Sequence, residues 1–322
     1  MSEARYYLGK EAKIMKQIGF PEIEKKKYTR QEWQLFFLVL PFMIILFLLA
    51  YAPIFGWIIS LYDYRPGIPL FENDYIGLKY FKSVLQDRDV LKALKNTAIF
   101  SGISFILTPL PMLFAVCLNE ISSTRYRKLV QTATTLPHFI SWVILYSFVF
   151  AMVSNDGVVN KVGMSLGLFS SPIRPLQDED IVYGFQIALT NWKGLGWASI
   201  IYIAAIAGIE QEQYEAALID GAGRFKTALY ITIPNLLPTF VVLLLMDVSN
   251  FVNTGYEQYF VFKNAFVYDK IEVLDLYIYR MGLQLGDYSY ATAVGIMKSF
   301  ISITLLFVSN AIAKKVRGEA IV

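Results

Sequence analysis

Three long stretches of this sequence contain no Asp, Glu, Lys or Arg, and they constrain the fold more than any other feature. They cover residues 33–62, 96–119 and 129–155 and are 30, 24 and 27 residues long. A hydrocarbon core about 30 Å thick is crossed by about 20 apolar residues in an α-helix. Each stretch can therefore span a membrane. A water-soluble fold is excluded for a chain with 56% hydrophobic and only 17% charged residues.

The second half of the chain contains three further hydrophobic segments, and each of them carries charge. The charged residues inside these segments are Lys193, Asp247, Glu257 and Lys298. The sequence therefore predicts an all-α polytopic membrane protein with a six-helix transmembrane domain in residues 33–313. The predicted spans are residues 33–62, 96–119, 129–153, 183–209, 239–262 and 288–313.

The distribution of basic residues predicts the orientation of the chain. The amino-terminal tail, residues 1–32, holds eight Lys/Arg and no apolar core of signal-peptide length. With this tail in the cytoplasm, the cytoplasmic segments hold 16 Lys/Arg and the opposite side holds 11. Because Lys and Arg favour the cytoplasmic side, we expect both termini, including the tail 314–322, and the connection 210–238 to face the cytoplasm.

The composition argues against a catalytic site or a bound cofactor in this chain. The sequence holds one histidine, His138, and one cysteine, Cys117, which leave little material for a metal site or a catalytic triad. It holds no phosphate-binding loop, so any nucleotide would be bound by another chain. The net charge of +3 is too small and dispersed to indicate nucleic acid as a partner.

The connection 210–238 has the pattern of a short helix, a glycine break and a second helix. Residues 212–219 are good helix formers with acidic residues in the first turn, and Gly221 and Gly223 follow as terminators. Residues 225–232 predict another short helix that ends before Pro234. A helix with such small side chains can enter a cleft on a partner protein. An interfacial helix lying on lipid is the alternative, but it would need a basic face and aromatic anchors.

The spacing Glu-Ala-Ala, three residues, Gly, nine residues, Ile-x-Leu-Pro resembles the cytoplasmic motif of one protein family. The family comprises the membrane subunits of bacterial ATP-binding-cassette (ABC) importers that work with a substrate-binding protein. The matching residues are Glu215, Ala216, Ala217, Gly221, Ile231 and Pro234, with Ile233 where leucine is usual. Asp220 and Ala222 match the Asp-Gly-Ala form of the carbohydrate branch.

Further motifs extend this resemblance over nearly the whole chain. Residues 119–120, 136–142, 192–197 and 289–293 resemble the oligosaccharide permease subgroup related to polygalacturonan and alginate importers. Within this subgroup the pattern is similar to the first membrane subunit of alginate importers and to related uronate-oligosaccharide permeases. The resemblance implies the type I ABC importer permease fold and a multi-pass location in the bacterial cytoplasmic (inner) membrane.

The resemblance also implies a set of partners. They are a homologous second permease subunit, two ATPase subunits that bind ATP and Mg, and an extracytoplasmic solute-binding protein that delivers an oligosaccharide. The loop helix would sit in a cleft of one ATPase and convert its closure into a tilt of the membrane helices. The ATPase-coupling residues implied are Glu215, Ala216, Ala217, Asp220, Gly221 and Ala222. Residues 63–89 and 154–180 would form docking surface for the binding protein.

Polar residues in the last three spans are candidates for the substrate path. A charged group at the bilayer centre costs about 3 kcal/mol on insertion scales, so it faces protein or a water-filled cavity. These candidates are Lys193 and Trp197 at i, i+4, Asp247, Asn250, Phe251 and Thr254 at i, i+3, i+4, i+7, and Lys298. These positions resemble the sugar-facing stripe of related maltose permeases.

Two interpretations of these polar residues remain open at the sequence level. Lys193 and Lys298 can supply positive potential for an acidic sugar, or Lys193 can pair with Asp247 and only hold helices together. His138 is expected to be a hydrogen-bonded packing residue. An ABC permease for a neutral sugar, an ion-coupled secondary transporter and a non-transporting scaffold are the alternative functions. The ion-coupled transporter predicts internal inverted repeats, and the sequence contains no convincing second copy of any segment.

Overall fold

The computed structural model describes residues 29–317, which belong to two compact units, Met1–Gly56 and Trp57–Val322. Within the described residues every secondary-structure element is helical, and the only bridge between extended residues joins Tyr62 to Tyr75. The all-α prediction is therefore confirmed. Most of the predicted amino-terminal tail and the last five residues of the predicted carboxyl-terminal tail lie outside the described residues.

The first unit consists of one long apolar helical segment. It begins as α2 (Arg30–Leu46), continues as the π-helical η1 (Phe47–Tyr51) and passes into the 3-10 helix η2 (Ala52–Leu61), which extends into the second unit. The regular α-helix ends at Leu46, before Pro53, and Pro53 itself lies in the 3-10 helix η2. A proline has no backbone N–H to donate to a helix. Together these elements match the predicted first span.

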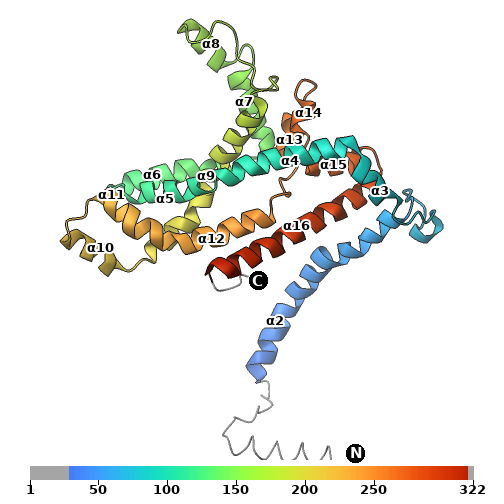
Figure 1. Ribbon diagram of the computed structural model, residues 1–322, viewed down its shortest axis with the longest axis horizontal. Coiled ribbons are helices and arrows are strands. Elements are labelled where there is room, and N and C mark those ends of the chain that lie inside the picture. Colours follow the sequence, from blue (N-terminus) through green and yellow to red (C-terminus); the bar gives the residue numbers. More distant parts are fainter. Residues whose placement is uncertain (1–28, 318–322) are drawn as a thin grey trace, which may run out of the picture. The chain divides into compact units, whose positions relative to one another are not determined.

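The second unit contains all remaining elements (Figure 1). In chain order they are η3 (Leu70–Glu72), α3 (Lys79–Gln86), α4 (Arg88–Ile106), α5 (Pro109–Asn119), α6 (Thr124–Thr135), η4 (Leu136–Phe139), α7 (Trp142–Val153), α8 (Val158–Ser165), α9 (Val182–Ala207), α10 (Gln211–Ile219), α11 (Arg224–Thr227), η5 (Ala228–Thr232), α12 (Ile233–Ser249), α13 (Glu257–Phe262), α14 (Tyr268–Ile271), α15 (Leu274–Tyr279), η6 (Arg280–Gln284) and α16 (Tyr288–Arg317).

Three apolar clusters hold the second unit together. One joins α4, α7, α9 and α13 around Phe100, Leu145 and Phe262. Another joins α5, α9 and α12 around Leu236, and the third joins α3, α4, α15 and α16 around Val294. Helix α9 takes part in the first two clusters, and so connects the two ends of the unit.

Helix α9 also crosses α6 at very short range. A Cβ atom added to Gly196 would lie 2.3 Å from the backbone carbonyl of Thr134, whereas one added to Gly194 would meet nothing within 4 Å. Small residues at such crossings let two membrane helices approach backbone to backbone. Gly196 is therefore required by space rather than by backbone conformation.

Among residues 29–317, five helical segments are long and apolar enough to span a membrane, or six if α9 and α10, which meet at a 73° bend, count as one span. The predicted span 129–153 is divided into α6, η4 and α7. The division follows from Pro137 in η4 and from Ser141, whose hydroxyl accepts a hydrogen bond from the backbone of Ile144 and caps α7. The predicted span 96–119 is divided between α4, which begins earlier, at Arg88, and α5, whereas the predicted spans 183–209 and 288–313 correspond to α9 and α16.

The fifth helix differs most from its predicted boundaries, 239–262. Helix α12 starts earlier, at Ile233, and ends at Ser249, and residues 250–256 form a non-helical linker before α13. Two asparagines, a threonine and a glycine in this linker are poor helix formers, and Gly255 adopts a φ of +72°. Hydrophobicity continues across the break, which is why the apolar pattern alone suggested one helix.

The predicted end of a short helix before Pro234 is also wrong. The chain stays helical through α11, η5 and α12, so Pro234 lies in the first turn of α12. A proline is tolerated there because first-turn N–H groups have no partner within the helix. The π-helical turn η5 precedes it, and the side-chain amide of Asn235 donates to the carbonyl of Ile231 at 2.8 Å.

Candidate functional site

The predicted loop helix is present as α10, and its end is built as the sequence indicates. Gly221 has a φ of +69°, and the amide of Ala222 donates to the carbonyl of Ala217 at 2.9 Å. A left-handed glycine with this backward hydrogen bond is a common way to end a helix. Gly223 has an ordinary φ of −74° and precedes α11. The two glycines therefore act differently, and only Gly221 needs the left-handed conformation.

The segment that contains α10 and the start of α11, residues 210–225, is the α10 loop, and it presents apolar side chains on its surface. Leu218 and Ile219 are 76% and 86% exposed, and Phe225 is 80% exposed. Glu215 and Ala216 are exposed on the same helix, and Ala217 is half-buried. Exposed apolar side chains gathered on one loop are typical of a protein interaction site.

Side-chain hydrogen bonds attach the α10 loop to the helices around it. The guanidinium of Arg224 donates to the hydroxyl of Ser122 at 3.0 Å, in the turn between α5 and α6. The side chain of Asn235 donates to that of Gln213 at 2.9 Å. The hydroxyls of Tyr214 and Thr232 lie 3.2 Å apart. A movement of α10 would therefore pull on α12 and on the α5–α6 turn, a link that the sequence motif alone does not reveal.

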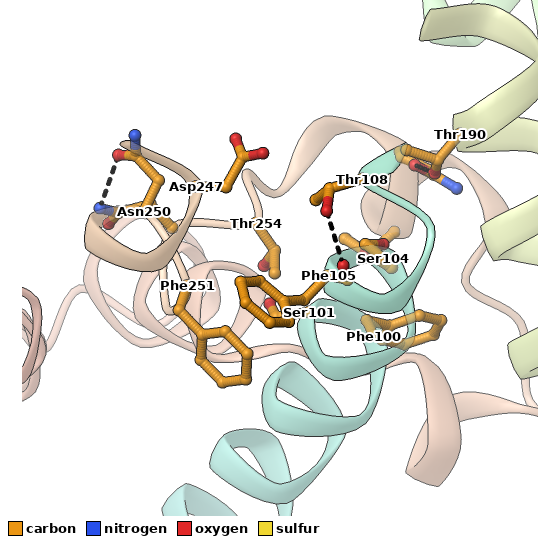
Figure 2. A pocket seen from close by; sticks show the side chains of 13 residues that line it. Phe100, Ser101, Ser104, Phe105, Thr108, Thr190, Asp247, Asn250, Phe251 and Thr254 are labelled. Atoms are coloured by element: carbon orange, nitrogen blue, oxygen red, sulfur yellow. Dashed lines mark hydrogen bonds between the residues drawn. The ribbon is translucent and has the colours of Figure 1, made fainter. Parts of the chain in front are cut away.

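A cavity of about 280 Å³ lies among α4, α9, α12, the 250–256 linker and α13 (Figure 2). Its lining combines aromatic rings with hydroxyl, amide and carboxylate groups: Phe100, Ser101, Ser104, Phe105, Thr108, Thr190, Asp247, Asn250, Phe251, Asn253, Thr254, Gln258 and Tyr259. Such a mixture of flat apolar faces and hydrogen-bonding groups is typical of small-molecule sites.

Four predicted path residues line this cavity, although by a different geometry from the one expected. Only Asp247 lies on a regular helix, and Asn250 ends it with φ −92° and ψ 8°. Phe251 and Thr254 belong to the linker, so the predicted helical stripe is interrupted. The backbone of Asn253 donates to the carbonyl of Asn250 at 2.8 Å and folds the linker back. The linker thereby keeps all four side chains at one cavity.

Lys298 lies outside the set of described residues that line the cavity. It forms an ion pair with Asp275 of α15, and the two side chains are only 14% and 15% exposed. The other carboxylate oxygen of Asp275 accepts a hydrogen bond from the backbone N–H of Gly255 at 2.8 Å. The pair therefore connects α16 and α15 to the linker that forms one wall of the cavity.

Lys193 and Trp197 also lie outside the described lining of the cavity. The ammonium of Lys193 donates to the backbone carbonyl of His138 at 2.6 Å and lies 5.3 Å from the ring centroid of Trp142. Among the described residues no ion pair joins Lys193 to Asp247, so the structure does not support the alternative in which these two side chains pair. The ring of Trp197 stacks on that of His138 with centroids 4.6 Å apart, which fits the packing role predicted for His138.

Sequence reasoning missed the contribution of α4 and α13 to the cavity. Ser101, Ser104, Phe105 and Thr108 follow one another at helical spacing inside the second charge-free stretch. Hydroxyls at this spacing among apolar residues could have indicated a polar face on this helix. Gln258 gave none, because it lies in a segment whose helix boundaries were wrong. Its side chain accepts from the hydroxyl of Thr190 at 2.8 Å and so joins α13 to α9.

A further polar cluster lies at the start of α4, away from the cavity. The carboxylate of Asp87 caps α4 and accepts hydrogen bonds from the hydroxyls of Tyr277 at 2.9 Å and Tyr290 at 2.5 Å. Burial opposes its charge, but the two hydroxyls and the backbone amides of Asp89 and Val90 outweigh that effect and lower the pKa of Asp87. The carboxylate therefore stays charged and holds α4, α15 and α16 together.

Comparison with known proteins identifies the family. The family described as "binding-protein-dependent transport system inner membrane component" matches residues 107–318. Protein LplB of Bacillus subtilis (strain 168) is 36% identical over 294 residues, covering 91% of this chain and 92% of LplB. The polygalacturonan/rhamnogalacturonan transport system permease protein YteP of the same organism is 34% identical over 293 residues, covering 90% of this chain and 91% of YteP.

A solved structure gives the same result in three dimensions. A chain of the bacterial alginate ABC transporter, crystallised in complex with an alginate pentasaccharide-bound periplasmic protein, matches with a TM-score of 0.81 and 32% identity. The match covers 91% of this chain and 98% of that chain. The resemblance inferred from the Glu215–Pro234 motif is thereby confirmed, and a type I permease fold is established. The chain therefore belongs to the family of binding-protein-dependent transport system inner membrane components.

Proposed function

We propose that this chain is one of two membrane subunits of an ATP-driven importer that carries oligosaccharides of uronic acids into the cell. Its partners would be a homologous second permease, two ABC ATPases that bind ATP and Mg, and an extracytoplasmic binding protein. The observation that carries the proposal is the likeness to the alginate transporter chain over 91% of the sequence, at a TM-score of 0.81. YteP, named for polygalacturonan and rhamnogalacturonan, points to the same class of acidic sugar.

The α10 loop supports the coupling part of the proposal. Leu218 and Ile219 are exposed apolar side chains on a short helix that is tied to α12 and to the α5–α6 turn. A partner that closes on ATP can grip this loop and move the helices attached to it. The positive-inside rule supports a cytoplasmic position for the loop and both termini.

The cavity supports a sugar as the transported molecule. Phe105 and Phe251 offer ring faces, while Asn250, Thr254 and Gln258 offer groups that bond hydroxyls. The chain would contribute one wall of a path that the second permease completes. No step of ATP hydrolysis would take place on this chain.

A neutral oligosaccharide is the second candidate substrate, and one observation favours it. The described lining of the cavity contains the carboxylate of Asp247 and no Lys or Arg. The carboxylate of a uronate passing this surface would need positively charged side chains from the second permease. The two candidates therefore differ in whether basic groups of the partner subunit are required.

Reconstitution tests the proposal directly. The chain is purified together with the products of its neighbouring genes, placed in lipid vesicles, and supplied with ATP, the binding protein and defined oligosaccharides. We expect ATP hydrolysis and sugar uptake to rise with uronate oligosaccharides and to stay at the basal level with neutral oligosaccharides of equal length. Stimulation by neutral sugars alone would replace the proposed substrate, and uptake without ATP would contradict the ATP-driven mechanism.

A further inference from the structure

A second cavity lies away from the candidate sugar path, beside the α10 loop. It has a volume of about 550 Å³ and opens among the end of α5, the start of α6, the end of α9 and the start of α10. Tyr214 of α10 forms part of its wall. The coupling motif of the loop does not account for the other side chains that line this cavity.

One wall of this cavity is basic and polar. Arg127, Lys128 and Gln131 contribute to it from α6, and Asn119 contributes from the end of α5. The lining described contains no Asp or Glu. Within residues 29–317 neither the guanidinium of Arg127 nor the ammonium of Lys128 has a hydrogen bond or an ion pair, whereas the charged groups of some other basic residues are paired with carboxylates. Two unpaired cations beside two amides form a surface that favours an anion.

The rest of the lining is mostly apolar. Ile203 and Ile206 contribute to it from the last turns of α9, and Leu118 contributes from α5. A ligand that fills the cavity must therefore combine an anionic group with a hydrocarbon part. Inorganic phosphate would leave the apolar side chains uncovered, whereas a phospholipid offers an anionic headgroup to the basic side chains and acyl carbons to the apolar ones.

We propose that this cavity binds the headgroup of an anionic phospholipid of the cytoplasmic leaflet, with its phosphodiester at Arg127 and Lys128 and its first acyl carbons along Ile203 and Ile206. The inference rests on the cytoplasmic orientation of the proposed function. Basic pockets between membrane helices on the cytoplasmic side suit such headgroups. Because Tyr214 of α10 lines the cavity, a bound lipid would hold the α10 loop in the position seen here, against the ends of α5, α6 and α9.

Native mass spectrometry of the intact importer tests this site without ATP, binding protein or sugar. The importer is titrated with phosphatidylglycerol or phosphatidylcholine, and the retained lipids are counted. We expect one phosphatidylglycerol fewer on R127Q/K128Q, with the half-saturating concentration of that lipid raised about thirtyfold, since each basic residue near the surface contributes about a factor of five. Phosphatidylcholine retention should not change. R125Q is the matched control, because Arg125 is exposed on α6 and outside the lining.

Further variants and a competitor distinguish a lipid site from a site for a free anion. R127K/K128R keeps both charges and should retain the lipid, so that equal loss in this variant would overturn the proposal. Should R127Q/K128Q fail to assemble, K128Q alone provides the measurement. Displacement of the lipid by millimolar inorganic phosphate would overturn the proposal in favour of a free-anion site. Because lipid retention is measured at rest, a failure here is distinguishable from a failure of the proposed transport function.

Discussion

The α10 loop and the cavity near α4 differ in how the sequence determines them. The loop is formed by consecutive residues: helix formers, a left-handed Gly221 and the restart of the helix at Arg224. The cavity is formed by three stretches of the sequence, residues 100–108, Thr190 and residues 247–259, whose side chains meet only after folding. Local sequence specifies the first region, whereas packing between distant segments specifies the second.

This difference predicts how substitutions affect each region. The loop depends on backbone conformation and exposed surface, so a substitution there should change the proposed coupling more than the stability of the rest. The cavity depends on partners far apart in the sequence, such as the lining residues Thr190 and Gln258, which are 68 residues apart and joined by a hydrogen bond. A substitution at one of these partners alters both the stability and the shape of the cavity.

The largest effect is expected at the Asp275–Lys298 pair. D275A leaves the ammonium of Lys298 buried without its carboxylate and removes the acceptor of the Gly255 N–H. Breaking one side of a buried pair costs about 3–5 kcal/mol. We expect D275A to lower the melting temperature of the importer and to abolish uptake, measured by thermal unfolding and by a transport assay in vesicles.

The double variant D275N/K298M sharpens this test. It removes both charges but keeps an oxygen that can accept from Gly255, so we expect stability and uptake to recover. If Lys298 instead supplied positive potential to an acidic sugar, D275N/K298M would lose uptake of uronate oligosaccharides even when fully stable. That outcome would contradict the positioning role of the pair.

A smaller loss of stability is expected at the crossing of α6 and α9. G196A places a methyl group 2.3 Å from the backbone of Thr134, and the overpacked helices must separate at a cost of about 3 kcal/mol. G194A is the matched control, because a Cβ there meets nothing within 4 Å. Thermal unfolding of both variants compares them, and equal melting temperatures would show that the close crossing does not exist.

The loop variant G221V should change coupling more than stability. A β-branched residue at a φ of +69° costs about 2 kcal/mol of backbone strain, although nothing crowds the site. We expect ATP hydrolysis stimulated by the binding protein to fall about tenfold, with a smaller fall in melting temperature than in G196A, because the exposed end of α10 can open locally and relieve the strain. G223V, at an ordinary φ of −74°, should keep its stimulation. Unchanged stimulation in G221V would contradict the coupling role of the loop.

The sequence predicted the loop in detail because its determinants are local. The bounds of α10 and the break at Gly221 follow from propensity and glycine placement alone. The short helix was expected to end before Pro234 because a proline disfavours the α conformation in the preceding residue, whereas the π-helical turn η5 continues directly into α12.

The cavity was predicted only in part because composition does not indicate which residues meet. The polarity of Asp247 and Asn250 marked the right region, yet the break after Ser249 was missed because the apolar pattern continues through it. Lys298 was expected at the sugar path, and its true partner, Asp275, lies on a short helix that was not predicted. A charge inside a span thus reveals that a partner exists, but not which residue it is.

The smallest effect is expected at the cluster of Asp87, Tyr277 and Tyr290, which are also far apart in the sequence. Asp87 has a lowered pKa because Tyr277 and Tyr290 donate to its charged form, so it stabilises the fold above the ordinary pKa of an aspartate. This stabilisation is lost as the pH falls through the lowered pKa. In Y277F/Y290F the pKa of Asp87 should return toward its ordinary value, so the protein should be less stable near neutral pH, and the part of the acid-induced fall in melting temperature that Asp87 causes should become smaller. Melting curves between neutral and acidic pH measure the shift, with Y288F as control because Tyr288, among the described residues, does not donate to Asp87. Identical pH profiles for Y277F/Y290F and the unaltered protein would show that the two hydroxyls do not hold this carboxylate, and the distant contacts would then matter less here than the local cap of α4.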